Sequence, residues 1–338
     1  MYLKSNPTKE NVSEESNSQI TAITTLPGVG PALARKLQEA GFNSLESIAT
    51  VSIGELMALG GLGEKTAGKM VQAAREKLGY GFVTADVILE SRRNMLRATT
   101  GADALDDLLN GGIETGSITE LYGEFRTGKT QLAHQLCVTC QLPPALGGFN
   151  IDEKPILCIY IDTEGTFRPE RIVSMANRFG SDLDVQMVLK HIFHGRAYNS
   201  DHQMVLVENI IKDAQFKNIK LVIVDSLIAH FRAEFVGRGT LAARQQKLNQ
   251  HLHSLLKLGE VSNVAVIVTN QVHSQPDMFF GDPTMPVGGH ILAHVSHTRI
   301  YLRKSKGERR IARIVDSPLL PESETVFAIT EKGIVDVQ

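Results

Sequence analysis

The chain has no tryptophan, only three cysteines among 338 residues, and a formal net charge of −2. An odd and low cysteine count argues against a disulfide-stabilised secreted domain and for a reducing intracellular compartment. The near-zero charge excludes binding to nucleic acid through bulk charge, so any such surface must be local. No apolar run approaches the ~18 residues of a spanning helix, which predicts a protein without a membrane partner.

The order of sequence patterns predicts a tail, two domains and a connector. Residues 1–20 are polar, with no apolar stretch behind a basic start, and predict a disordered tail rather than a signal peptide. Residues 21–79 have helical patterns interrupted by glycine, and residues 80–98 form a connector. Residues 99–338 alternate apolar runs with helical patterns, and their length suits one larger domain.

The smaller domain repeats a Gly-x-Gly turn followed by a helical pattern, at Gly28–Gly30 and Gly61–Gly63. These turns resemble the helix-hairpin-helix motif, in which amides at a helix start contact phosphates without reading base sequence. A small all-α DNA-binding domain is therefore predicted. The alternative is a pair of turns that only pack helices, and the nearly balanced charge of residues 21–79 leaves it open.

The larger domain has fully apolar runs separated by helical patterns, which predicts an α/β fold with a mainly parallel sheet covered on both faces. A different pattern, at residues 299–316, predicts two antiparallel edge strands around a Lys-Gly turn. The expected buried strands are residues 118–123, 156–162, 189–195, 221–225 and 264–270.

The stretch GEFRTGKT, residues 123–130, fits G-x-x-x-x-G-K-[ST] between a predicted strand and a predicted helix. Gly123 and Gly128 allow the backbone to wrap around phosphate, Lys129 would reach the β and γ phosphates, and Thr130 would hold Mg²⁺. A chance match in a strand-to-helix turn is the alternative. The predicted cofactors are ATP and Mg²⁺, and the rest of the expected binding segment is Glu124, Phe125, Arg126, Thr127 and Gln131.

Two acidic segments at predicted strand ends complete the expected site. Asp225 ends LVIVD and would hold the magnesium ion or its water, although such a residue can also cap a turn. Asp162 and Glu164 follow another strand, and Glu164 is the candidate that polarises the attacking water as a general base. Alternatively, Glu164 is solvated or pairs with a nearby arginine.

Several segments together resemble the RecA-like strand-exchange recombinases, with archaeal and eukaryotic members similar over residues 20 to about 335. They include GADALDDLLNGGIETGSITELYGEFRTGKTQLAHQL, IDTEGTFRPERI, LVIVDS, GRGTLAARQQKLNQHL, VTNQV and GDPTMPVGGHILAH. The resemblance implies a P-loop RecA-like ATPase core that polymerises with ATP on single-stranded DNA, captures a duplex and exchanges strands. It further implies helical filaments or rings of this chain, recombination mediators, and a cytoplasmic, nucleoid-associated location in an archaeal cell.

The resemblance also assigns roles to matching residues. Glu164 corresponds to the glutamate that activates water, and Arg171 to an arginine near adenine. Gln271 corresponds to a glutamine that senses the γ-phosphate and leads into a DNA loop. His294 corresponds to a histidine that reads the neighbour's nucleotide, and Asp316 lies in a segment that caps ATP across the subunit interface. The FRT of the phosphate loop departs from the FGS common in archaea and looks more eukaryotic.

Two glycine-containing segments are candidates for DNA contact. Residues 271–290 have no strand or helix period, and the resemblance makes them a DNA loop that includes Gly288 and Gly289. Residues 231–239 are expected to form a second loop, with Arg232 and Arg238 suited to phosphate. A flexible insertion and ordinary solvated arginines are the alternatives. The basic run at residues 303–313 is expected to be a solvated hairpin edge or part of a DNA groove.

Phe82 and Ala85 lie three positions apart in the connector, where a linker by itself cannot bury a phenylalanine. The resemblance implies that both insert into a neighbouring subunit while the linker adds a strand to its sheet, which gives a head-to-tail polymer. Alternatively, Phe82 packs on its own ATPase domain. Cys137 and Cys140 are expected to pack within a helix rather than bind a metal.

Rival functions share the same nucleotide site. A recombinase paralogue would bind ATP and partners without exchanging strands, a ring helicase would translocate, and a signalling ATPase would not need DNA. The intact phosphate loop, Glu164, the long segment 271–290 and the connector motif together favour strand exchange.

Overall fold

A computed structural model of the chain describes residues 23–337 except 43, 60, 94, 152–153, 181–182, 215–216, 275–283 and 289. The predicted tail and Gly289 lie outside the described residues. The chain divides into two compact units, Met1–Arg93 and Asn94–Gln338, and the division falls within the expected connector. Among the described residues, no helix is long and apolar enough to cross a membrane.

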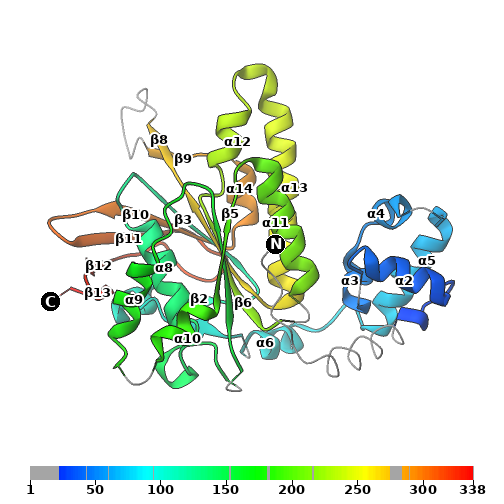
Figure 1. Ribbon diagram of the computed structural model, residues 1–338, viewed down its shortest axis with the longest axis horizontal. Helices are drawn as coiled ribbons and strands as arrows, with labels where there is room; N and C mark the ends of the chain where they lie inside the picture. The colour runs from blue at the N-terminus through cyan, green and yellow to red at the C-terminus, as the bar shows by residue number, and fades with distance from the viewer. Residues whose placement is uncertain are drawn as a thin grey trace. The chain divides into compact units, whose positions relative to one another are not determined.

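The smaller unit is all α-helical and has its own apolar core (Figure 1). Two of its helices begin directly after the predicted glycine turns, with Gly30 and Gly63 as N-caps. Gly28 and Gly61 have φ angles of +80° and +84°, so both turns need the left-handed conformation that glycine adopts readily. The helices are α2 (Pro31–Glu39), α3 (Leu45–Thr50), α4 (Ile53–Ala58) and α5 (Glu64–Lys77).

The connector contains a helix that the sequence analysis did not predict, α6 (Ala85–Arg93). None of its residues is buried. The residues of this helix after Asp86 include leucine, glutamate and two arginines, which favour helix, so local propensity accounts for it.

A nine-stranded sheet forms the centre of the larger unit (Figure 1), in the order β13-β12-β11-β10-β3-β7-β6-β4-β5. The strands from β10 to β5 in this order are parallel, whereas β11, β12 and β13 extend the sheet as antiparallel neighbours. The predicted α/β fold with a mainly parallel sheet and an antiparallel edge is confirmed. The strands are β3 (Ile118–Gly123), β4 (Leu157–Asp162), β5 (Ile192–Arg196), β6 (Ile219–Asp225), β7 (Ala265–Asn270), β10 (Thr298–Lys304), β11 (Arg309–Asp316), β12 (Glu324–Thr330) and β13 (Gly333–Asp336).

Helices cover both faces of this sheet, as apolar strands require, and two apolar cores result. One face packs against α8 (Lys129–Thr139), α9 (Pro169–Asn177) and α10 (Val185–Lys190). The other packs against α11 (Ser200–Asp213), α12 (Ala229–Glu234), α13 (Leu241–Ser262) and α14 (His290–Val295). Further elements of this unit are α7 (Asp103–Leu108), β1 (Arg97–Ala98), β2 (Ile113–Glu114), η1 (Pro144–Leu146) and η3 (Arg238–Thr240).

The predicted strand 189–195 is wrong at its start. Residues up to Lys190 belong to α10, and β5 begins only at Ile192. The reason is a helix cap, because the Asp184 side chain accepts hydrogen bonds from the amides of Gln186 and Met187.

Both segments that were expected to be loops contain regular structure. Arg232 lies on α12 and residues 238–240 form the turn η3, so 231–239 is not an irregular loop. In 271–290, strand β8 (Val272–Ser274) pairs antiparallel with β9 (Thr284–Pro286). The strands are three residues each, too short for a period of two to be recognised in the sequence.

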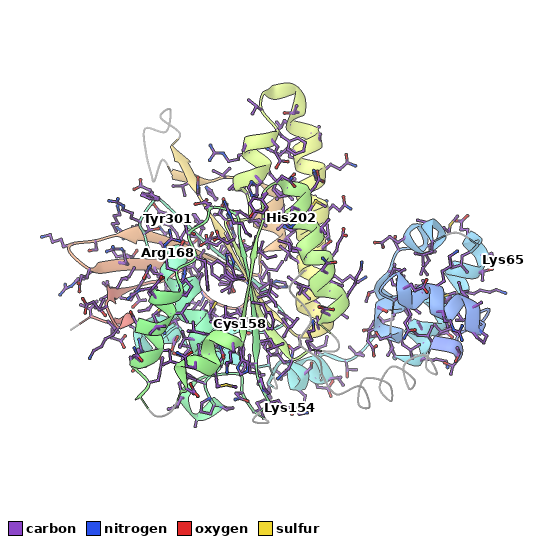
Figure 2. All side chains as sticks on the ribbon, in the orientation of Figure 1. Lys65, Lys154, Cys158, Arg168, His202 and Tyr301 are labelled. Carbon is purple, nitrogen blue, oxygen red and sulfur yellow. The ribbon has the colours of Figure 1, made fainter. Side chains whose placement is uncertain are left out.

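All three cysteine side chains are buried in the core that contains α8. Figure 2 shows Cys158 inside the larger unit, where its Sγ lies 3.0 Å from Sγ of Cys140. Cys137 and Cys140 pack within α8 and its C-terminal cap, as predicted.

Candidate nucleotide-binding site

The phosphate loop joins β3 to α8 and opens onto a cavity of about 560 Å³. The cavity lies at the carboxyl ends of parallel strands, where α/β sheets bind ligands. The residues that line it are Gly123, Phe125, Arg126, Thr127, Gly128, Lys129, Thr130, Gln131, Glu164, Thr166, Asp225, Ser226, Thr269, Gln271, Val272, Arg310 and Ile329.

The two glycines of the loop meet different constraints, a close backbone approach at Gly123 and a left-handed backbone conformation at Gly128. A Cβ on Gly123 would lie 2.1 Å from the carbonyl oxygen of Leu302 on the neighbouring strand β10. Gly128 has a φ of +110°, and its Cβ would lie 2.6 Å from Cδ1 of Ile329. Any larger residue would push the loop off the sheet and turn its amides away from the cavity.

Lys129 begins α8 and folds its side chain back along the loop. Its Nζ donates hydrogen bonds to the carbonyl oxygens of Gly123, at 2.8 Å, and Glu124, at 2.7 Å. Burial lowers the pKa of Lys129, and the carboxylates of Asp225, Glu164 and Glu124 oppose that shift. The ammonium group is thus held in a partly desolvated position, where its attraction for phosphate is strong.

Asp225, at the end of β6, is held by three hydroxyl groups. Thr130 Oγ1 donates to it at 2.8 Å and the Tyr160 hydroxyl at 2.7 Å, and Thr269 Oγ1 donates to its other carboxylate oxygen. A carboxylate beside a threonine hydroxyl is the oxygen donor set that Mg²⁺ prefers in phosphate sites. The residues present therefore fit the ion.

Tyr160 and Thr269 were not predicted from the sequence. They lie on β4 and β7, the neighbours of β6 on either side, and face Asp225 only through the strand order. Each lies in an apolar run, where a single polar side chain does not stand out from the pattern of a buried strand. Their spacing in the chain contains nothing that could have identified them.

Glu164 is exposed in the turn after β4, and its carboxylate accepts a hydrogen bond of 3.0 Å from Nε2 of Gln271. Gln271 directly follows β7. The structure thus brings together two predicted site residues that come from different strand ends, and both line the cavity.

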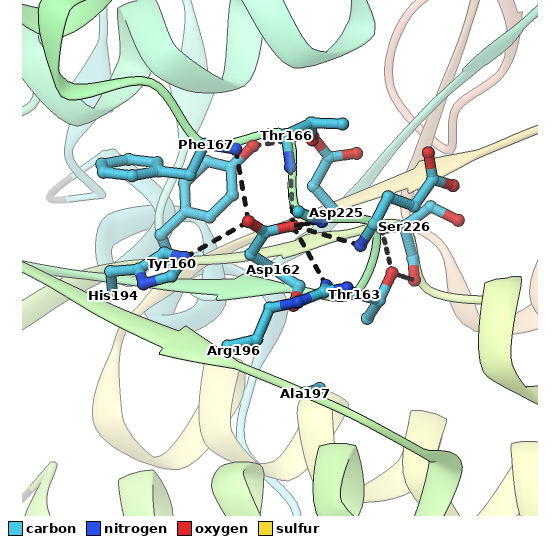
Figure 3. A network of polar contacts seen from close by, with 12 residues as sticks. Tyr160, Asp162, Thr163, Thr166, Phe167, His194, Arg196, Ala197, Asp225 and Ser226 are labelled. Atoms are coloured by element: carbon cyan, nitrogen blue, oxygen red, sulfur yellow. Dashed lines mark hydrogen bonds and ion pairs between the residues drawn. The ribbon is translucent and has the colours of Figure 1, made fainter.

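The turn that presents Glu164 is organised around the buried carboxylate of Asp162 (Figure 3). Asp162 accepts backbone hydrogen bonds from Glu164, Gly165 and Thr166 on one oxygen and from Phe167 on the other. Four amides directed at one carboxylate fix the turn closely. Asp162 is therefore a positioning residue for Glu164 rather than a second base.

Two cationic or protonatable groups also face Asp162. His194 Nε2 lies 3.2 Å and Arg196 Nη1 3.6 Å from its carboxylate oxygens. Burial raises the pKa of Asp162, but the hydrogen bonds from His194 and from the turn amides outweigh burial, so the pKa lies below its usual value. The group is an anion at neutral pH.

Phe167 anchors the far side of this turn among aromatic rings. Its ring lies 5.2 Å from that of His134, 5.0 Å from that of His194 and 4.9 Å from that of Tyr160. Burial lowers the pKa of His134, so the ring is neutral. Its Nε2 accepts the Arg168 amide while Nδ1 donates to the carbonyl oxygen of Thr130, which connects the turn to α8.

Arg171, the predicted neighbour of adenine, is held in place by the protein itself. Its Nε donates to Oε1 of Gln131 at 2.6 Å, and its other nitrogens donate to the carbonyl oxygens of Thr330 and Glu331. Burial lowers its pKa. Through these bonds Arg171 joins α9 to the turn between β12 and β13, beside the cavity wall that Gln131 lines.

Arg310 and Ile329 line the cavity but were not predicted. Both come from the antiparallel strands β11 and β12. Strand β12 was not expected at all, because residues 324–330 follow a Pro- and Ser-containing stretch without a clear alternation. Sheet extension alone brings these strands to the phosphate loop.

Other predicted residues lie away from this cavity. His294 on α14, Asp316 at the end of β11 and Arg232 on α12 are exposed, and the structure does not place them among the lining residues. Gly288 has a φ of +106° and borders Ile228, while the turn η3 begins at Arg238.

Phe82 is 111% exposed, and Ala85, also exposed, is the first residue of α6. Neither side chain of the two predicted polymerisation residues is buried by the described residues of its own unit.

Comparison with known proteins assigns both units. The family description Rad51 matches residues 91–337, and the description SAM-like helix-hairpin-helix tandem matches residues 20–76. The DNA repair and recombination protein RadA of Aeropyrum pernix is 54% identical over 323 residues, covering 95% of this chain and 99% of that protein. The protein of the same description from Ignicoccus hospitalis is 52% identical over 316 residues, covering 94% and 96%.

Proposed function

The chain belongs to the Rad51 family, in agreement with its resemblance to the RecA-like recombinases. We therefore propose that this protein is an ATP-dependent DNA strand-exchange recombinase. It forms filaments on single-stranded DNA and promotes homologous pairing in recombinational repair. The observation that carries the proposal is the hydrogen bond between Glu164 in the nucleotide cavity and Gln271 at the start of segment 271–290. This bond joins the hydrolytic side of the site to the segment proposed to hold DNA.

ATP hydrolysis would use the cavity residues in distinct roles. Lys129 and the loop amides bind the phosphates, and Glu164 takes a proton from the attacking water as general base. Thr130 and Asp225 would hold Mg²⁺, which supplies positive charge against the phosphate oxygens. Asp162 keeps Glu164 in place through the turn amides.

Gln271 gives the site a means to respond to nucleotide. The side-chain amide of Gln271 donates a hydrogen bond to the carboxylate of Glu164. A γ-phosphate bound near Glu164 would compete with that carboxylate for the same side-chain amide. Movement of Gln271 would be transmitted to β8, which begins at the next residue. Binding of ATP, more than its cleavage, would thereby switch the DNA-holding state.

Polymerisation would use the exposed connector. Phe82 is exposed in its own unit, and a pocket on a neighbouring copy would cover it. A head-to-tail contact of this kind produces a helix or a ring. The positions of His294 and Asp316, exposed and outside their own cavity, suit action on the neighbour's nucleotide.

DNA would contact both units. Arg232 and Arg238 and the segment that contains Gly288 and Gly289 are the candidates in the larger unit. In the smaller unit, the helix starts at Gly30 and Gly63 have backbone amides without a side-chain cap, and such amides suit phosphate oxygens. Both single-stranded and double-stranded DNA are the proposed partners, together with recombination mediators. The location would be the archaeal nucleoid, where the chromosome lies.

A regulatory paralogue without strand exchange is the alternative, and the similarity to recombination proteins over almost their full length disfavours it. The decisive experiment is a D-loop assay with ATP, and with a slowly hydrolysed analogue, using Lys129→Ala as the inactive control. Joint molecules with both nucleotides are expected. ATP turnover without joint molecules would support the paralogue, and single particles in electron micrographs with nucleotide, Mg²⁺ and oligonucleotide would reject filament formation.

A further inference from the structure

A fully buried carboxylate lies in the centre of the sheet, outside the catalytic machinery described above. Glu120 on β3 has 0% of its surface exposed, and Arg299 on β10, opposite in parallel register, donates from Nε to its Oε2 at 2.7 Å. Taking two charges out of water is costly, and a buried ion pair is often no better for stability than apolar residues of the same volume. Packing alone therefore does not account for this ion pair.

The other oxygen of Glu120 holds Asn270, the last residue of β7. Asn270 Nδ2 donates to Oε1 of Glu120 at 2.8 Å and to the carbonyl oxygen of Val287 at 2.6 Å. Its Oδ1 accepts from the amide of Gln271 at 2.8 Å. Both N–H groups and the carbonyl of this completely buried side chain are used.

The partners of Asn270 are the two ends of one segment. Gln271 begins it and Val287 lies near its end, and the Val287 amide also donates to the carbonyl oxygen of Gln271 at 2.9 Å. An aspartate in place of Asn270 could accept from Gln271 but could not donate to Glu120 and Val287. An apolar residue could neither donate nor accept. The geometry thus demands an asparagine at this position.

We propose that Asn270, anchored by the buried Glu120–Arg299 pair, is a positioning residue that joins the two ends of segment 271–290 and fixes Gln271 toward Glu164. This rests on the proposed function, because it assumes that the segment holds DNA and that Glu164 acts in hydrolysis. The rigid sheet then serves as the reference against which Gln271 moves. Without Asn270, Gln271 would move more freely, and DNA binding would stimulate hydrolysis less.

The test compares ATP hydrolysis with and without single-stranded DNA in the full chain and in Asn270→Ala, Gln271→Ala and the double variant. Asn270→Ala is expected to lower the DNA stimulation about tenfold, because it removes the one buried hydrogen bond that holds the backbone amide of Gln271. If Asn270 acts through Gln271, the double variant will match Gln271→Ala alone. Unchanged stimulation in Asn270→Ala, or losses that multiply in the double variant, would overturn the proposal.

The matched control is His297→Ala. His297 Nδ1 accepts from the Ile118 amide at the opposite end of β3, so this variant also removes one sheet-supporting bond. Its DNA stimulation is expected to equal that of the unaltered chain. A loss equal to that of Asn270→Ala would show a general loosening of the sheet and overturn the specific role.

Hydrogen exchange in the unaltered chain provides a measurement that does not depend on any variant folding. The amides of Gln271 and Val287 are expected to exchange as slowly as those in β7, because both are held by the network. Fast exchange at both would contradict the clamp. If the unaltered chain hydrolyses ATP without DNA stimulation, the proposed function fails instead, and hydrogen exchange still decides whether the clamp exists.

Discussion

Gln271 donates a hydrogen bond of 3.0 Å to Glu164, although the two residues are 107 positions apart in the chain. One follows β7 and the other follows β4, and β6 lies between these strands in the sheet. The parallel arrangement brings all three carboxyl ends to one edge, so a residue of the expected DNA segment meets the expected catalytic base.

Replacing Glu164 by glutamine keeps the shape of the side chain but removes the base. ATP hydrolysis is expected to fall about 10²- to 10⁴-fold, whereas nucleotide should still bind through Lys129 and the loop amides. Steady-state phosphate release and binding of a fluorescent nucleotide measure the two effects. Glu170→Gln, an exposed change on α9, is the control. A hydrolysis rate unaffected by Glu164→Gln would remove this residue from the mechanism.

Asp162→Asn tests the turn that holds Glu164. The NH₂ group of the asparagine cannot accept a hydrogen bond where Oδ2 of Asp162 accepts one, so the bond from the Phe167 amide is lost. ATP hydrolysis should therefore fall, while nucleotide binding should persist. The lowered pKa of Asp162 adds a pH effect. Its carboxylate stabilises the fold above the ordinary aspartate pKa, and this stabilisation disappears as pH falls through the lower folded pKa.

Thermal unfolding of Asp162→Asn between neutral and acid pH measures that contribution, which the variant should lack. Asp184→Asn is the matched control, because asparagine caps a helix as well as aspartate does. Equal acid sensitivity of Asp162→Asn and the unaltered chain would contradict the assigned role of the carboxylate.

Thr269→Val removes one of the three hydroxyl groups that hold Asp225 and preserves volume. Loss of an outer partner of a metal ligand typically weakens metal affinity about 10- to 100-fold. The Mg²⁺ concentration needed for half-maximal hydrolysis should therefore rise within that range. Thr139→Val, which removes a buried hydroxyl bonded to the carbonyl oxygen of Thr99, should leave the Mg²⁺ requirement unchanged. Identical Mg²⁺ titrations for both variants would exclude Thr269 from the metal site.

Phe82→Glu tests the connector. A charged side chain cannot enter an apolar pocket on a neighbour without a large desolvation cost, so short soluble species are expected instead of polymers. Light scattering with nucleotide and DNA measures the assembly. Met57→Glu, which places the same charge at a 40% exposed residue of α4, should polymerise normally. Polymer of unchanged length from Phe82→Glu would show that the phenylalanine is not the plug.

His251 lies on α13 and is fully buried, with its Nε2 3.0 Å from Nε2 of Gln203 on α11, and burial lowers its pKa from 6.5 to about 4. As the pH falls, His251 therefore binds a proton in the unfolded chain before it does so in the folded chain. The free energy of unfolding is unaffected by this group above pH 6.5 and decreases as the pH falls toward 4. The loss approaches about 3 kcal/mol at the lower limit. His251→Gln should flatten this part of the dependence of unfolding on pH. His253→Gln, exposed on the same helix, should retain it, and parallel curves for all three proteins would contradict the assignment.

Local patterns in the sequence determined the type and order of the main elements. The phosphate loop, the apolar strands before Glu164, Asp225 and Gln271, and the glycine turns before α2 and α5 depend on short-range rules of conformation and burial. Neighbouring residues determine the conformation of a glycine turn and of an apolar run of strand length, so both can be predicted from a single sequence. The ends of elements such as α10, where a cap competes with an apolar run, were less predictable.

Strand order and register decided the rest. Tyr160 and Thr269 hold Asp225, and Asn270 meets Glu120, because their strands lie side by side in the sheet. Hydrogen bonds between such residues form only after distant segments pair, and their spacing along the chain leaves no periodic trace. Short-range patterns thus identify the residues that can do the chemistry. Which of these residues are held together depends on packing, because contacts between distant residues form only in the folded chain.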